Sequence, residues 1–203
     1  MHINCAQYDP GKLYFLLIQT VIPRPIAWIL SDNGNGTYNL APFSFFNAVS
    51  ADPPVLMISA GFKPDGPRKD TWENIDKRGD FVVHIPSVDQ SEVMVATSAA
   101  LPHGESEVTQ MNVALVKEQG WCLPRVKGAK AAFLCEKFAI HEIGNAQALI
   151  LGKINHIWLD DGILTQDKGR LTVDPKALNP VARLGGSLYA ALGQILTLRR
   201  PEN

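Results

Sequence analysis

Residues 39–60, NLAPFSFFNAVSADPPVLMISA, decide the fold, because a strand-like run breaks there into a short, polar, tightly turned segment and resumes at residues 55–58. Ser44, Asn47 and Ser50 recur at intervals of three among aromatic and aliphatic residues. Such hydroxyl and amide groups can hydrogen-bond a neighbouring turn of backbone or a ligand. The prolines at residues 53–54 make the turn rigid. We interpret the segment either as a buried connection whose polar groups satisfy one another or as a preformed ligand site.

The composition limits the possible classes of protein. The chain has 203 residues, with 19 basic and 20 acidic side chains and a formal net charge of −1. This length is most simply one domain over residues 1–203, and the lack of a basic stripe argues against a nucleic-acid partner. The apolar stretch at residues 13–18 is too short to span a bilayer, and no basic region precedes an apolar core at the N-terminus. We therefore expect a cytoplasmic protein without membrane association.

The cysteines and histidines give no pattern typical of metal sites. Three cysteines are an odd number, and no two of them form a CxxC pair, so we expect free thiols in a reducing compartment. The five histidines show neither HxH nor HExxH spacing. The sequence therefore predicts no metal site.

The pattern of short apolar runs and turn residues predicts a mainly β protein with helical additions. We expect strands at residues 26–30, 55–58 and 81–85, a hairpin turn at residues 31–36, and two long strands within residues 130–160 around Gly144 and Asn145. Helices are expected at residues 12–20, 69–78 and 89–99, and a short one after residue 174. Hairpin-linked strands with inserted helices favour an antiparallel barrel, and no GxGxxG sequence follows a strand to indicate a dinucleotide-binding sheet.

The helix expected at residues 69–78 has an informative start. Asp70 can cap it while Glu73 reaches back, which is a capping box that needs no ligand. This explanation leaves Lys69 and Thr71 without a role. Because a helix N-terminus carries partial positive charge and free amide donors, a flanking lysine and hydroxyl would complete a phosphate site.

Two further side chains are held in restricted backbone. Arg24 lies between two prolines, so we interpret it either as a surface charge or as an anion ligand. His103 lies between Pro102 and Gly104 on a loop, where a side chain can face either a site or solvent.

Six motifs in sequence order resemble one family, the flavin reductase-like, FMN-binding split-barrel proteins of the flavoredoxin type. The resemblance covers about residues 20–192. The motifs are RPIAW at residues 24–28, NLAPFSFFN at 39–47, SADPP at 50–54, KDT at 69–71, HGESE at 103–107 and VARLGG at 181–186.

The resemblance implies an FMN-binding split β-barrel that forms a homodimer, with FMN near the subunit interface. It also implies that hydride passes from NADH or NADPH to FMN, and that electrons pass on to free flavin for a monooxygenase or to an acceptor protein. Hydride transfer is the chemistry of the cofactor, so we name no catalytic side chain. Neither nicotinamide is favoured, because no reader of a 2′-phosphate is recognisable.

The cofactor-binding residues carried over from the family fall into three groups. The phosphate would be held by Arg24, Lys69, Thr71 and Ser44, with Pro25 and Asp70 inside the same motifs. The isoalloxazine would be lined by Phe45, Phe46, Asn47, Ala48 and Ser50, largely through backbone groups. His103, Gly104 and Ser106 would close over the ring or the nicotinamide, although many relatives have a basic residue at the place of His103.

Two other functions fit parts of the pattern. An FMN-binding electron carrier would use the same fold and site without reacting with nicotinamide. An oxidase of the pyridoxine-phosphate type would need extra cationic residues for a second phosphate, and the sequence has no such cluster. A hydrolase is disfavoured because no GxSxG sequence is present.

Overall fold

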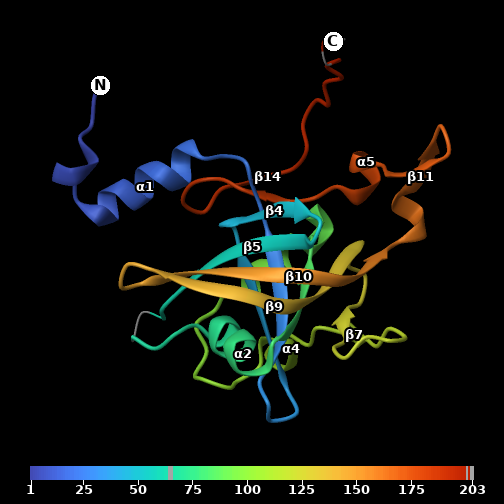
Figure 1. Ribbon diagram of the computed structural model, residues 1–203, viewed down its shortest axis with the longest axis horizontal. Helices are drawn as coiled ribbons and strands as arrows, with labels where there is room; N and C mark the ends of the chain where they lie inside the picture. The colour runs from blue at the N-terminus through green and yellow to red at the C-terminus, as the bar shows by residue number, and fades with distance from the viewer. Residues whose placement is uncertain (64–65, 200, 202–203) are drawn as a thin grey trace.

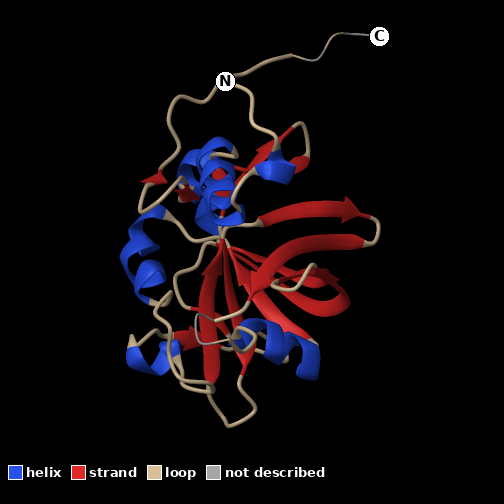
Figure 2. Cartoon of the chain, turned by 90° about the vertical axis from the view of Figure 1, so that its left-hand side faces the viewer, coloured by secondary structure: helices blue, strands red, loops and turns tan. Residues whose placement is uncertain are grey.

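A curved antiparallel sheet of seven strands forms the centre of the molecule (Figures 1 and 2). The computed structural model describes residues 1–63, 66–199 and 201. The strand order is β3-β2-β6-β9-β10-β5-β4. Its strands are β2 (Ala27–Asp32), β3 (Tyr38–Phe43), β4 (Phe46–Ala51), β5 (Pro54–Gly61), β6 (Asp80–His84), β9 (Ala131–Ile143) and β10 (Gln147–Leu159). The mainly β fold is as predicted.

Three smaller sheets flank this barrel. The one that matters for the site, called here the small sheet, has three strands in the order β1-β13-β14 and lies at the same end of the barrel as both termini (Figure 1). The strands of the small sheet are β1 (Arg24–Pro25), β13 (Ala182–Arg183) and β14 (Tyr189–Ala190). The other two are the pairs β7 (Leu115–Val116) with β8 (Arg125–Val126), and β11 (Leu164–Asp167) with β12 (Arg170–Val173).

The helices are short and lie around the barrel (Figure 2). They are α1 (Pro10–Thr20), α2 (Asp70–Arg78), α3 (Ser91–Ala96), α4 (Glu107–Gln110) and α5 (Pro175–Leu178), with single 3-10 turns η1 (Cys5–Gln7), η2 (Val88–Gln90) and η3 (Asp161–Ile163). The helix expected at residues 89–99 is therefore shorter than predicted and begins as a 3-10 turn. Within the described residues, no helix is both long and apolar enough to cross a membrane.

The barrel buries apolar side chains on both faces of its central strands. In β2, Ala27 and Ile29 join one core cluster, and Trp28 and Leu30 join the other. This explains why β2 reads as a continuous apolar run instead of an alternating one. In β10, a Cβ atom at Gly152 would lie 2.3 Å from the ring of Phe81, which belongs to β6. Only glycine at this position leaves room for the Phe81 ring.

The strands β9 and β10 form the long hairpin that was predicted, with the turn at Gly144 in the left-handed region at φ 57°. The prediction for the segment after Phe43 was wrong in part. Residues 46–51 are the edge strand β4, paired with β5, and the tight turn is confined to the Asp52–Pro53 region. Phe46 points into the core, whereas the polar and small residues after it occupy an exposed sheet edge.

Candidate functional site

A cavity of about 370 Å³ lies between α1, the small sheet and the start of α2. Aromatic rings and hydroxyl groups form much of its wall. In the described part of the chain, no Asp or Glu side chain lines it, although three cations do. Its lining includes Tyr14, Arg24, Ser44, Phe45, Lys69 and Arg183.

Arg24 is a buried clamp at the edge of this cavity, with 6% of its surface exposed. Its Nη1 donates to the carbonyls of Ile18 at 2.6 Å and Val21 at 2.9 Å, and its Nη2 donates to the carbonyl of Leu184 at 2.9 Å. Its Nε reaches the Ser44 hydroxyl at 3.4 Å. These contacts leave one guanidinium N–H for a ligand. Arg24 therefore ties the end of α1 to the small sheet, and it is not the surface charge that was one reading of the sequence.

Lys69 is the cation most open to a ligand at the start of α2. It occupies the N-cap position without a capping side-chain bond, and its Nζ lies 5.4 Å from the centre of the Phe43 ring. Partial burial of its ammonium group in the cavity lowers the pKa of Lys69. The first amides of α2 and the positive end of the helix dipole lie beside it, and the side chain of Thr71 is in the first turn.

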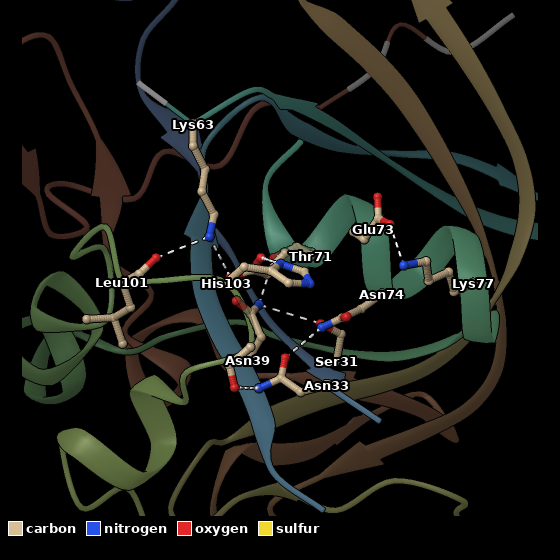
Figure 3. A network of polar contacts seen from close by, with 12 residues as sticks. Ser31, Asn33, Asn39, Lys63, Thr71, Glu73, Asn74, Lys77, Leu101 and His103 are labelled. Atoms are coloured by element: carbon tan, nitrogen blue, oxygen red, sulfur yellow. Dashed lines mark hydrogen bonds and ion pairs between the residues drawn. The ribbon is translucent and has the colours of Figure 1, made fainter. Parts of the chain in front are cut away.

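The capping role predicted for Asp70 is wrong. Asp70 is the first residue inside α2, and its buried carboxylate accepts from Lys63 Nζ at 2.9 Å and pairs with His103 Nδ1 at 2.5 Å. Lys63 also donates to the carbonyl of Leu101 at 3.1 Å (Figure 3). Asp70 thus fastens the loop at residues 101–106 to the helix. Sequence reasoning missed Lys63, because no local pattern links it to a partner seven residues later.

A second cavity of about 220 Å³ adjoins the first and shares Pro42, Phe43, Lys69 and Ser98 with it. Thr71 lines this second cavity, and its hydroxyl accepts from Asn39 Nδ2 at 2.8 Å. Lys69 is the charged residue common to both cavities, so a ligand in the larger cavity can place an anionic end in the smaller one.

Glu107 is a buried carboxylate that the sequence reasoning did not single out as a site residue. It lines the second cavity and accepts a hydrogen bond from the Leu40 amide at 2.9 Å. Burial raises the pKa of Glu107, and the negative charge of Asp70 adds to this effect. Glu107 is therefore easier to protonate than an exposed glutamate.

The other residues of the loop serve its attachment to the barrel. Ser106 caps α4 and donates to the Tyr38 carbonyl at 2.6 Å, while the Gly104 carbonyl accepts from Asn35 at 3.1 Å. His103 has a side chain that is 62% exposed and reaches Asp70. These three predicted residues lie near the second cavity without lining it.

The structure brings together only part of the predicted site. Ser44, Phe45, Arg24 and Lys69 line the larger cavity, and Asp70 and Thr71 line the smaller one. The remaining predicted residues lie outside both cavities: Phe46 lies in the core, and Pro25, Asn47, Ala48 and Ser50 are exposed.

Two residues that the sequence reasoning missed lie at the small-sheet end of the larger cavity. Arg183 stacks over the Tyr189 ring, with its Cζ 4.4 Å from the ring centre, and both line the cavity. Arg183 belongs to the VARLGG motif, which indicates the family but assigns no role to this side chain.

The residues present fit a flavin mononucleotide. An isoalloxazine needs an apolar, partly aromatic slot, and its phosphate needs cations and amide donors. The larger cavity supplies the rings of Tyr14, Phe45 and Tyr189, and Lys69 with the start of α2 supplies the positive end. Among the described residues, no three His, Cys, Asp or Glu side chains form a group able to hold a metal ion.

Comparison with known proteins agrees with this geometry. The family model "Flavin reductase like domain" matches residues 19–174. The uncharacterized protein YwrF of Bacillus subtilis is 38% identical over 97% of this chain and 97% of its own length.

Solved structures resemble nearly the whole chain. Nitrilotriacetate monooxygenase component B from Bacillus cereus has a TM-score of 0.89 and 32% identity, covering 98% of each chain. The 2-nitrobenzoate 2-nitroreductase NbaA of Pseudomonas fluorescens has a TM-score of 0.88 and 28% identity, covering 99% of this chain and 96% of its own. The resemblance inferred from the motifs is confirmed, and this chain belongs to the flavin reductase-like family of split-barrel, flavin-binding oxidoreductases.

Proposed function

We propose that this protein is an FMN-dependent NAD(P)H oxidoreductase that passes the electrons of reduced flavin to a second acceptor. The observation that carries the proposal is the larger cavity, which has aromatic walls, three cations and, among the residues that the structure describes, no lining carboxylate. The residues that line the cavity would hold FMN, which would supply the chemistry of hydride transfer from the nicotinamide and electron transfer to the acceptor. The protein supplies binding and orientation, because this chemistry needs no acid or base from a side chain.

In this proposal, Lys69, Thr71 and the first amides of α2 hold the flavin phosphate. Charge-assisted hydrogen bonds to a phosphate are of the strong type, and a helix N-terminus favours anions. Arg24 fixes Ser44 and Phe45 beside the ring and contributes at most one direct contact. With about 31 heavy atoms at roughly 0.3 kcal/mol each, we expect FMN to bind with a dissociation constant below about 1 μM.

The protein acts as a homodimer in this proposal, and the second copy covers the exposed residues of β4. Exposed apolar side chains on α1 and the C-terminal segment support an interface: Tyr14, Phe15, Leu17, Leu192, Leu196 and Leu198. A dimer across this surface would bring Asn47, Ala48 and Ser50 to the flavin site from a neighbouring subunit.

The names of two relatives suggest the electron acceptor. One solved relative is a component of a monooxygenase and another is a nitroreductase. Reduced flavin from this protein would accordingly serve either a partner monooxygenase or an aromatic nitro compound bound at the site itself.

The test is anaerobic mixing of the FMN-loaded protein with NADH and, separately, with NADPH while the flavin absorbance near 450 nm is followed. Rapid bleaching with either nucleotide is expected. A bound flavin that neither nucleotide bleaches would indicate an electron carrier reduced by another protein. Absence of FMN binding would contradict the proposal altogether.

A further inference from the structure

The larger cavity contains more positive charge than one flavin phosphate requires. Arg24 and Arg183 are directly paired across strands β1 and β13, and both line the cavity. Like charges opposite each other on paired strands destabilise a sheet, and no carboxylate lines this cavity within the described residues to offset them. The arrangement therefore favours an anionic ligand at the small-sheet end.

Arg24 is already compensated by the protein. Its guanidinium donates to three carbonyls, two of which belong to the C-terminal end of α1, where the helix dipole is negative. Arg183 has much less compensation: its Nη2 donates to the Gly186 carbonyl, and its face stacks on Tyr189. The stacking holds the guanidinium plane in place, and the other N–H groups along its edge are available for a ligand.

Lys69 and Arg183 come from different elements around the same cavity, the start of α2 and the small sheet. Figure 1 shows α2 below the strands β9 and β10, with β14 above them on the side where both chain termini lie. The Lys69 end has the helix amides and Thr71, which suit a resident phosphate dianion. The Arg183 end has an aromatic ring and one delocalised cation, which suit a phosphate carried by a second, exchangeable ligand.

We infer that Arg183, stacked on Tyr189, binds a phosphate group of the nicotinamide dinucleotide that reduces the flavin. This inference rests on the proposed function. It assigns the flavin phosphate to the Lys69 end of the cavity and a phosphate of the nicotinamide dinucleotide to the Arg183 end. The planar guanidinium can form two parallel hydrogen bonds to a phosphate, which a lysine cannot do.

The experiment measures equilibrium binding to the FMN-loaded protein with NAD⁺, a probe that cannot reduce the flavin. Calorimetric titration gives its dissociation constant for the wild type, Arg183→Gln, Arg183→Lys and the matched control Arg170→Gln in the exposed hairpin of β11 and β12. We expect Arg183→Gln to weaken NAD⁺ binding about 10- to 100-fold, because a charge-assisted hydrogen bond is lost. Arg183→Lys should weaken NAD⁺ binding less than Arg183→Gln does, and Arg170→Gln should leave the dissociation constant for NAD⁺ unchanged.

A measurement on the unaltered protein removes dependence on the folding of any variant. The wild-type dissociation constant for NAD⁺ should rise with ionic strength, because the contact is between charges. Affinity that is independent of salt, or an Arg183→Gln protein that binds NAD⁺ as the wild type does, would overturn the inference. Loss of FMN binding with unchanged riboflavin binding in Arg183→Gln would also overturn it, since Arg183 would then hold the flavin phosphate.

Failure of the proposed function has a different signature. In that case the wild-type protein itself would not bind FMN, or bound FMN would not be bleached by either reduced nucleotide. If the wild type binds FMN and its flavin is bleached by a reduced nucleotide, but the Arg183 variants bind NAD⁺ as the wild type does, only the assignment of Arg183 is contradicted.

Discussion

At the scale of single residues, His84 shows how strongly the barrel fixes a titratable group. His84 is fully buried; its Nδ1 donates to the Trp28 carbonyl at 2.8 Å, and its Nε2 accepts from the Val126 amide at 2.9 Å. Only the neutral ring can do both, because a protonated Nε2 cannot accept. Burial lowers the pKa of His84 to about 4, helped by the charge of Arg125 and opposed by the bond to Trp28.

This geometry predicts a loss of stability in mild acid. The unfolded chain takes up the His84 proton near its ordinary value of 6.5, whereas the folded protein takes it up only near 4. The stabilisation is therefore fully present above about pH 6.5 and is lost as the pH falls toward 4, by about 3 kcal/mol in total. Urea unfolding at a series of pH values should show this slope.

The control for this prediction compares two histidine variants. His84→Gln should flatten the slope between pH 6.5 and 4, whereas the exposed His141→Gln should leave it as in the wild type. An equally steep slope in His84→Gln would show that other groups cause the acid sensitivity.

Residue patterns in the sequence located conformationally restricted positions better than they identified the partners of those side chains. The two prolines correctly marked Arg24 as held in place, but its partners are carbonyls from α1 and from a residue 160 positions later. Asp70 matched a capping box, yet its carboxylate binds Lys63 through one oxygen and His103 through the other. Such contacts depend on the tertiary fold, which local patterns cannot show.

At the scale of elements, Asp70 couples α2 to the loop at residues 101–106. We expect Asp70→Asn to destabilise the protein by about 2–3 kcal/mol, because the replacement leaves the Lys63 ammonium without its buried counter-charge. Hydrogen exchange should also become faster in this loop. Chemical unfolding and exchange measured by mass spectrometry test both effects.

Asp76→Asn is the matched control in the same helix. Its ion pairs with Arg68 and Lys137 involve half-exposed side chains, so we expect a loss below about 1 kcal/mol. Equal destabilisation by the two substitutions, with no change in exchange of the loop, would contradict the coupling.

Elements with strong local signals were predicted well. The long strands β9 and β10 follow from alternation and a Gly-Asn turn, and α2 ends at Gly79 with φ at 86° as its sequence indicates. β4 was misread, because small and polar residues on an exposed edge strand look like a turn when the partner strand is unknown.

At the scale of the whole molecule, the exposed apolar side chains of α1 predict association of two copies. Phe15 is 57% exposed and Leu17 is 47% exposed. The double substitution Phe15→Glu and Leu17→Glu should produce a monomer, because buried charges are costly at an apolar interface. Light scattering after gel filtration measures the mass.

Lys12→Glu, on the same helix but at its polar start, is the control and should stay dimeric. A wild type that is monomeric at all accessible concentrations would refute the dimer. A double variant that remains dimeric would place the interface elsewhere.

The central proposal is that the cavity between α2 and the small sheet holds FMN by its phosphate. The direct measurement is titration of FMN and riboflavin into the protein, followed by flavin fluorescence, for the wild type, Lys69→Gln and Lys77→Gln. We predict that FMN binds the wild type with a dissociation constant below about 1 μM. Lys69→Gln should lower the affinity for FMN about 10- to 100-fold and change the affinity for riboflavin little. Lys77 is exposed at the other end of α2, so Lys77→Gln should bind both flavins as the wild type does. Equal FMN affinity in all three proteins, or none in the wild type, would contradict the assignment of the site.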